Sequence, residues 1–147
     1  MAPIVTSIEI ARRPEEVFAY VTDPSKLPEW QESLISSSTE EGGPPAVGSR
    51  VTQTRRVGRG ERTMTLEITE IAPPRGWAVR GIDGPVRGMV KGTVEPVDGE
   101  GSRVTIELEF EGQGIGKLLV PLVVRRQARA EMPTNMQNLK ERLEGRG

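Results

Sequence analysis

The sequence predicts an α+β fold in which a curved antiparallel sheet packs against one long C-terminal helix. Residues 33–112 form a succession of segments with strand-like alternation, separated by turns rich in glycine and proline. After Gly112 the apolar residues recur at helical spacing. The chain has 147 residues, enough for one domain with a substantial core. Its 17 glycines and 12 prolines fit many short strands better than a bundle of long helices.

The N-terminal segment predicts one strand and two short helices. Residues Ile4–Ile10 alternate between apolar and polar side chains, as in a half-buried strand. A helix is expected to start at Pro14, because proline fits a first helical turn and the two glutamates that follow favour the positive end of the helix dipole. Asp23 ends this helix and caps a second short helical piece that runs to Trp30.

Six further strands are expected, with short turns between them, which predicts an antiparallel meander with one solvated face. Their expected ranges are Leu34–Glu41, Ser49–Val57, Arg62–Ile71, Trp77–Asp83, Val86–Val97 and Arg103–Phe110. The last of these segments alternates most regularly between apolar and polar residues.

The C-terminal helix is expected to run from just after Gly112 to about Arg142. Its roughly 30 residues would span about 45 Å, enough to cross the sheet. Its apolar stripe comprises Ile115, Leu118, Leu122, Met132, Met136, Leu139 and Leu143. Pro121 and Pro133 are expected to kink or interrupt it, because each lacks a backbone donor. A sheet curved around one helix cannot close tightly on it, so we expect a ligand-sized cavity between them.

The composition excludes several kinds of chemistry. The chain contains no histidine and no cysteine, which removes disulfides, cysteine nucleophiles, serine–histidine pairs and metal sites built from these residues. We therefore expect no metal and no other cofactor. The 20 basic and 21 acidic residues give a net charge of -1 without a long run of one sign, so no nucleic-acid partner is expected.

Membrane insertion and export are not expected either. The longest apolar stretch, Leu118–Val124, is much shorter than the roughly 20 residues of a membrane span. Residues Met1–Ile10 lack the basic leader and extended apolar segment of a signal peptide. The sequence predicts a soluble cytoplasmic protein, either a monomer or a homodimer.

A set of segments spread over the whole chain is similar to one known superfamily. These segments are Pro14–Pro24, Leu27–Trp30, Val47–Arg50, Ile68–Pro74 before Trp77, Gly92–Val97 before Arg103–Thr105, and the basic helix ending Asn138–Glu144. In this order they resemble the SRPBCC superfamily, specifically its polyketide cyclase/dehydrase-like, START-related group. The resemblance implies a helix-grip fold, in which a seven-stranded antiparallel sheet wraps a C-terminal helix around a deep ligand cavity. It also implies a function like those of lipid and quinone carriers, plant hormone binders or aromatase/cyclases. The Rieske oxygenase domains of the superfamily are excluded, because their metal site needs histidine.

Strand alternation and helical spacing nominate the side chains that would line the cavity. Each apolar one fits ordinary core packing as well as ligand contact. The candidate ligand-binding residues are Gln53, Arg55, Met64, Leu66, Trp77, Val79, Val90, Leu122, Arg125, Arg129 and Met132.

The polar candidates carry the chemical expectations. Arg55 lies in an apolar strand face, where a buried guanidinium needs a carboxylate partner or an anionic ligand. Arg125 and Arg129 fall within the apolar stripe and, if they point inward, would hold a ligand carboxylate or enolate through bidentate hydrogen bonds. Alternatively, a proline kink turns them outward or their charged ends reach water. Glu70 and Asp83 are the candidate acidic partners or general bases.

Two functions fit these residues. The first is binding or transport of a small, largely apolar metabolite such as a lipid, polyketide, isoprenoid or aromatic molecule. The alternative is a cyclase/aromatase-like enzyme that closes a poly-ketone by aldol reaction or dehydration, with Glu70 or Asp83 as the base and Arg55, Arg125 or Tyr20 as the donor. A regulatory module with an exposed groove is disfavoured by an aromatic content of only 3%.

Overall fold

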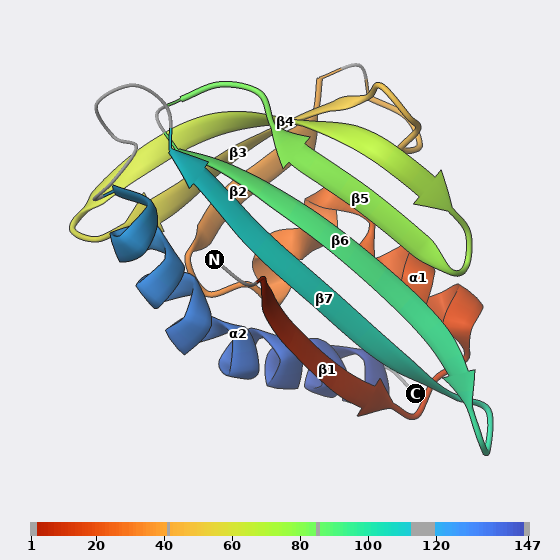
Figure 1. Cartoon of the computed structure of the whole chain (residues 1–147). Coiled ribbons are helices and arrows are strands. Elements are labelled where there is room, and N and C mark those ends of the chain that lie inside the picture. Colours follow the sequence, from red (N-terminus) through yellow and green to blue (C-terminus); the bar gives the residue numbers. More distant parts are fainter. Residues whose placement is uncertain (1–2, 41, 85, 113–119, 146–147) are drawn as a thin grey trace.

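The computed structural model describes residues 3–40, 42–84, 86–112 and 120–145. Within these ranges one seven-stranded antiparallel sheet runs in the order β1-β7-β6-β5-β4-β3-β2 and curls around a long C-terminal helix (Figure 1). The strands are β1 (Ile4–Ile10), β2 (Leu34–Thr39), β3 (Arg50–Val57), β4 (Gly60–Ala72), β5 (Gly76–Gly81), β6 (Val86–Val97) and β7 (Gly101–Gly112). The helices are α1 (Pro14–Val21), the 3₁₀ helix η1 (Pro24–Glu29) and α2 (Val120–Gly145). The predicted helix-grip architecture is therefore confirmed.

Some strand ends differ from the prediction because pairing continues further along the chain. The β3–β4 hairpin pairs up to Val57 and Gly60, which leaves only Gly58 and Arg59 as its turn. Gly58 has a φ of 60°, the left-handed conformation that glycine supplies in such two-residue turns. The strand expected from Arg62 therefore begins two residues earlier, at Gly60.

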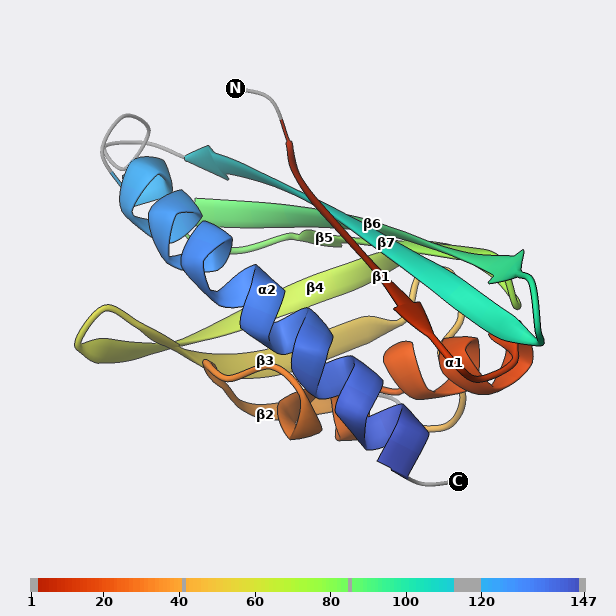
Figure 2. The ribbon, with the colours of Figure 1, turned by 90° about the horizontal axis from the view of Figure 1, so that it is seen from below.

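Helix α2 crosses the concave face of the sheet (Figure 2). It begins at Val120, so Pro121 stands in the first turn, where the backbone donor that proline lacks would have no helical partner. The helix continues through Pro133, which is exposed. Within residues 120–145 the helix is therefore not interrupted at Pro133, while the segment before Pro121 lies outside the described residues. The predicted stripe residues Ile115 and Leu118 lie outside the described residues.

The core lies where the C-terminal half of α2 meets α1, β1, β6 and β7. Its fully buried residues recur on α2 at Met136, Leu139 and Leu143, with spacings of three and four. Val94 and Val104 of the paired strands β6 and β7 are also fully buried in this cluster. At the other end of α2, Leu122 and Val123 are exposed. The helix therefore anchors the fold through its residues from Met132 onward, whereas Leu122 and Val123 stay outside the core.

Polar contacts fix the C-terminal end of α2 against β1. The Glu144 carboxylate accepts hydrogen bonds from the Ala11 backbone N–H at 2.9 Å and from Lys140 Nζ at 2.7 Å. Lys140 Nζ also donates to the Glu9 carbonyl at 2.8 Å. The bonds from Lys140 and Ala11 lower the pKa of Glu144. No helix in the described ranges is both long enough and apolar enough to span a membrane.

Candidate functional site

A cavity of about 500 Å³ lies between the concave face of the sheet, η1 and α2. Its walls on the sheet are mainly apolar and come from β3 to β7. These residues include Val51, Met64, Leu66, Ile68, Ile71, Trp77, Val79, Val90, Ile106, Leu108 and Phe110. The volume falls within the usual range for small-molecule sites.

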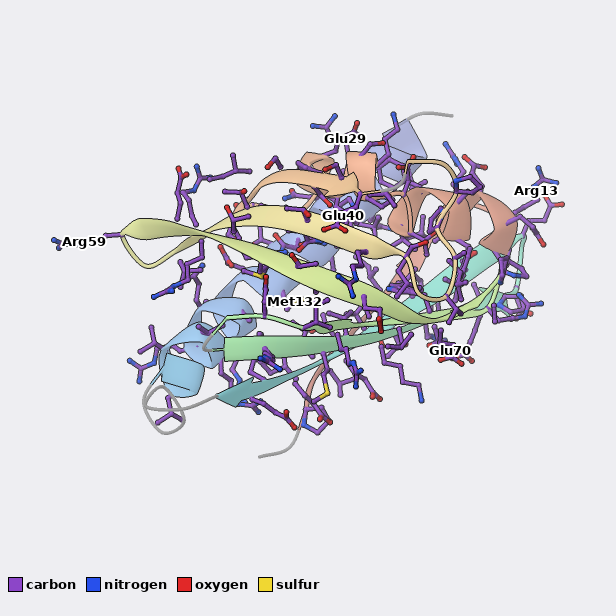
Figure 3. All side chains as sticks on the ribbon, turned by 90° about the horizontal axis from the view of Figure 1, so that it is seen from above. Arg13, Glu29, Glu40, Arg59, Glu70 and Met132 are labelled. Atoms are coloured by element: carbon purple, nitrogen blue, oxygen red, sulfur yellow. The ribbon has the colours of Figure 1, made fainter. Side chains whose placement is uncertain are left out.

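Most of the side chains nominated from the sequence lie on the cavity wall. Eight of the eleven candidates line it, and all but one of these come from the sheet. They are Gln53, Arg55, Met64, Leu66, Trp77, Val79, Val90 and Met132. Met132 is the one from α2, and Figure 3 shows it near the middle of the molecule.

Trp77 forms part of both the cavity wall and the core. Its backbone pairs with Gly92 of β6, and its indole ring lies directly over that glycine. The ring also meets Phe18 of α1 edge-on, with the centroids 6.1 Å apart and the planes at 77°. Trp30 lines the cavity from the segment after η1 and is buried. Both tryptophans of the chain therefore border the cavity.

The main polar group in the cavity wall is the half-buried guanidinium of Arg55. Its Nη1 donates to Ser33 Oγ at 2.9 Å. Its Nη2 donates to Gln31 Oε1 at 2.7 Å and to Gln53 Oε1 at 3.4 Å. The direct acceptors are thus neutral oxygens, where the sequence led us to expect a carboxylate or an anionic ligand.

Glu131 of α2 is the acidic residue that acts on Arg55. Burial lowers the pKa of the Arg55 guanidinium, and electrostatic attraction to Glu131 opposes this effect. Both residues line the cavity, Arg55 from β3 and Glu131 from the helix. They make no direct ion pair or hydrogen bond in the described part of the chain, so they act on each other across a gap.

Glu70 and Asp83, the expected acidic partners, do not contact Arg55 in the described part of the chain. Glu70 is exposed and stands outside the cavity lining, at the margin of the molecule in Figure 3. Asp83 lies at the rim of the cavity, and its carboxylate accepts a hydrogen bond from the Thr65 backbone N–H at 2.9 Å. The predicted donor Tyr20 is buried in the core and donates to Glu29 Oε1 at 2.7 Å.

Three nominated residues of α2 lie outside the cavity lining. Leu122 and Arg129 are exposed, and Arg125 is half-buried. Of the two orientations that the sequence left open for these arginines, the structure therefore has the one outside the cavity lining. The cavity face of α2 comprises Val124, Gln127, Ala128, Glu131, Met132 and Asn135. At 3.6 residues per turn, this face is rotated by roughly 90° from the core stripe of the C-terminal half. One straight apolar stripe does not describe both faces, because the helix crosses a twisted sheet and the side that faces the protein changes along the helix.

The sequence reading missed a polar row on this face. Gln127, Glu131 and Asn135 are four residues apart, a spacing that marks one helical face and could have been recognised. Gln127 joins the helix to the β3–β4 hairpin. Its Nε2 donates to the Arg56 carbonyl at 2.9 Å, and its Oε1 accepts from the Gly58 backbone N–H at 3.0 Å. Asn135 accepts a hydrogen bond from the Glu32 backbone N–H at 3.0 Å.

Comparison with solved structures gives the same fold. The Zhui aromatase/cyclase from Streptomyces sp. R1128 is 14% identical, with a TM-score of 0.83 over 98% of this chain and 94% of that one. The protein TTHA0849 from Thermus thermophilus is 18% identical, with a TM-score of 0.79 over 99% of each chain. The di-domain ARO/CYC BexL from the BE-7585A biosynthetic pathway is 15% identical, with a TM-score of 0.74. The match covers 98% of this chain and 47% of BexL, so this chain spans about half of that protein. At these identities the likeness establishes the fold alone.

Comparison of the sequence gives a family. No curated protein matches it significantly. Residues 1–144 match the family described as polyketide cyclase / dehydrase and lipid transport. Because this match covers nearly the whole chain and the fold agrees with it, the protein belongs to the polyketide cyclase/dehydrase and lipid transport family.

Proposed function

We propose that the protein binds a small, largely apolar molecule in the cavity between the sheet and α2. The observation that carries this proposal is the cavity of about 500 Å³, whose sheet walls are mainly apolar and whose polar groups include Arg55 and Glu131. Such a site gains affinity from apolar burial and orients its ligand through a few polar contacts. The family description, which includes lipid transport, supports the same proposal.

The ligand contacts we propose follow the cavity wall. Of the residues nominated from the sequence, they include Gln53, Arg55, Met64, Leu66, Trp77, Val79, Val90 and Met132. Gln31, Glu131 and Asn135 join them because they line the same cavity. Leu122, Arg125 and Arg129 are not part of this proposal.

Intrinsic fluorescence tests the proposal. The two tryptophans, Trp30 and Trp77, both border the cavity, so a bound aromatic or aliphatic guest changes the surroundings of the indoles. We expect a saturable change in emission when 2-acetonaphthone, a long-chain ketone or a long-chain alcohol is titrated. The change should be reduced in the Trp77→Phe variant. Absence of a saturable response to all three compounds, with no binding heat in calorimetry, would contradict the proposal.

A second candidate function is ketone chemistry in the same cavity, because Arg55 and Glu131 face it from opposite walls. Glu131 would remove a proton from the carbon next to a ketone, while an Arg55 N–H donates a hydrogen bond to the resulting enolate oxygen. The enolate carbon would then attack a second carbonyl of the same molecule, and the new alkoxide would take the proton back from Glu131. The likeness to a protein described as an aromatase/cyclase favours this candidate.

Hydrogen exchange on a bound ketone separates the two functions. If the protein is an enzyme of this kind, the methyl hydrogens of 2-acetonaphthone should exchange with D2O faster in its presence. The Glu131→Gln variant should lose this acceleration by about 100-fold or more, the usual contribution of a general base. Nuclear magnetic resonance measures the exchange directly. Saturable binding without accelerated exchange would contradict the enzymatic function and would still support the binding function.

A further inference from the structure

We infer that the cavity selects neutral guests with a single hydrogen-bond acceptor, such as a ketone, over carboxylates, and that Glu131 sets this preference. The inference rests on the proposed binding function, and it concerns which chemical class the cavity accepts. It is carried by the hydrogen bonds already made by Arg55 and by the charges that line the cavity.

The first step concerns the donors that Arg55 has left for a guest. A guanidinium has five N–H groups and grips a carboxylate through two parallel bonds, using either Nε and Nη2 or Nη1 and Nη2. Both pairs require a hydrogen of Nη2. Nη2 already donates to Gln31 at 2.7 Å and to Gln53 at 3.4 Å, and Nη1 donates to Ser33. At most one N–H group on Nη1 and one on Nε therefore remain for a ligand. They can donate to a single acceptor oxygen but cannot form the bidentate pair of bonds to a carboxylate.

The second step concerns charge. Among the described residues, the positive ones that line the cavity are Arg55 and Arg62, and the negative ones are Glu61, Asp83 and Glu131, which is two against three. Glu61, Arg62 and Asp83 are exposed and therefore lie where water screens them. Glu131 is only half-exposed and already supplies the attraction that Arg55 feels. A carboxylate placed at Arg55 would meet the repulsion of Glu131 in a poorly screened space.

The third step concerns the remaining wall. Val79 and Val90 are paired neighbours on β5 and β6, and both line the cavity with apolar side chains. An anion that leaves water for such surroundings loses its hydration and needs full compensation in return. Arg55 does not provide this compensation, because its Nη2 already donates to two glutamines and its charge is attracted to Glu131. A ketone loses much less hydration and needs only one donor.

Two nearly isosteric probes test the inference: neutral 2-acetonaphthone and anionic 2-naphthoate. Their dissociation constants are measured by calorimetry at about pH 7, where an ordinary carboxylic acid is ionised. We expect the wild-type protein to bind the ketone at least about tenfold more tightly. Because a neutral guest enters apolar surroundings more readily in any case, the decisive measurement is the change in this ratio in the Glu131→Gln variant. A neighbouring negative charge disfavours an ionised carboxylate by about one or more pKa units, which is a factor of about ten in an equilibrium constant. Removing the charge of Glu131 should therefore shift the ratio of the two dissociation constants about tenfold in favour of naphthoate.

The control variant is Glu141→Gln, which removes the same charge from an exposed position on the same helix, outside the cavity. Its ratio should stay at the wild-type value. A second variant, Gln31→Leu, removes an acceptor from Nη2 and frees one fork of Arg55, so it should also raise the relative affinity for naphthoate. This variant tests the idea independently if Glu131→Gln does not fold, and thermal unfolding reports on both.

The outcomes separate the inference from the function it rests on. Tighter binding of naphthoate than of ketone by the wild type would overturn the inference while upholding a binding cavity. So would ratios that stay constant in both Glu131→Gln and Gln31→Leu. If neither probe binds to any variant, and the aliphatic ketone and alcohol do not bind either, the proposed function itself fails.

Discussion

Replacement of Gly92 by alanine should destabilise the protein by about 2–3 kcal/mol, the usual cost of overpacking a well-filled core. A Cβ atom at this position would overlap the indole ring of Trp77. That ring is buried and rests edge-on against Phe18, so moving it off Gly92 disturbs its packing against α1. Chemical denaturation of purified protein gives the free energy of unfolding that checks this value.

Gly88 provides the matched control, because it lies four residues earlier on the same strand. A Cβ at Gly88 would approach the Phe110 ring at 3.4 Å, an ordinary contact. Gly88→Ala should therefore change the free energy of unfolding by less than about 0.5 kcal/mol, the usual range for substitutions without a clash. Equal stability of the two variants would show that Trp77 does not lie over Gly92 as described.

Substitution of Val90 by tryptophan should abolish measurable binding of 2-acetonaphthone, or weaken it by at least about 100-fold, which is about 2.7 kcal/mol of binding free energy. Val90 is half-buried in the middle of the concave face and lines the cavity. A larger side chain there enters open space instead of displacing packed core, so the fold should be retained. Calorimetric titration and thermal unfolding of the same preparation check both statements.

Met89 offers the control for a large side chain on the same strand. It precedes Val90, lies on the opposite face of the sheet, and stands beside Arg80 and Arg87 outside the cavity. Met89→Trp should bind the ketone as the wild type does. Unchanged affinity in Val90→Trp would mean that the ligand sits elsewhere, and equal loss in both variants would point to a general disturbance of β6.

The sheet could be predicted from the sequence because its information is local. Alternation along each strand fixes which side chains face the helix, and short turns fix the neighbouring strand. Alternation predicts Gln53, Leu66 and Val79 on the inner face, and in the structure they line the cavity. The seven strands and the C-terminal helix could be predicted for the same reason.

The polar part of the site could not be predicted in this way, because it joins segments that are distant in sequence. The partners of Arg55 come from the segment after η1, at Gln31 and Ser33, and from α2, at Glu131. No spacing rule links these positions. The direction of Arg129 stayed open in the sequence for a related reason, because helical periodicity gives the relative angles of side chains but not which side meets a twisted sheet.

The two ends of α2 have different roles. Met136, Leu139 and Leu143 pack in the core and hold the helix there, whereas Val124, Gln127 and Glu131 line the cavity. Substitutions of helix residues that line the cavity without belonging to the core cluster, such as Val124 and Glu131, therefore leave the anchoring contacts of Met136, Leu139 and Leu143 intact and should cost little stability.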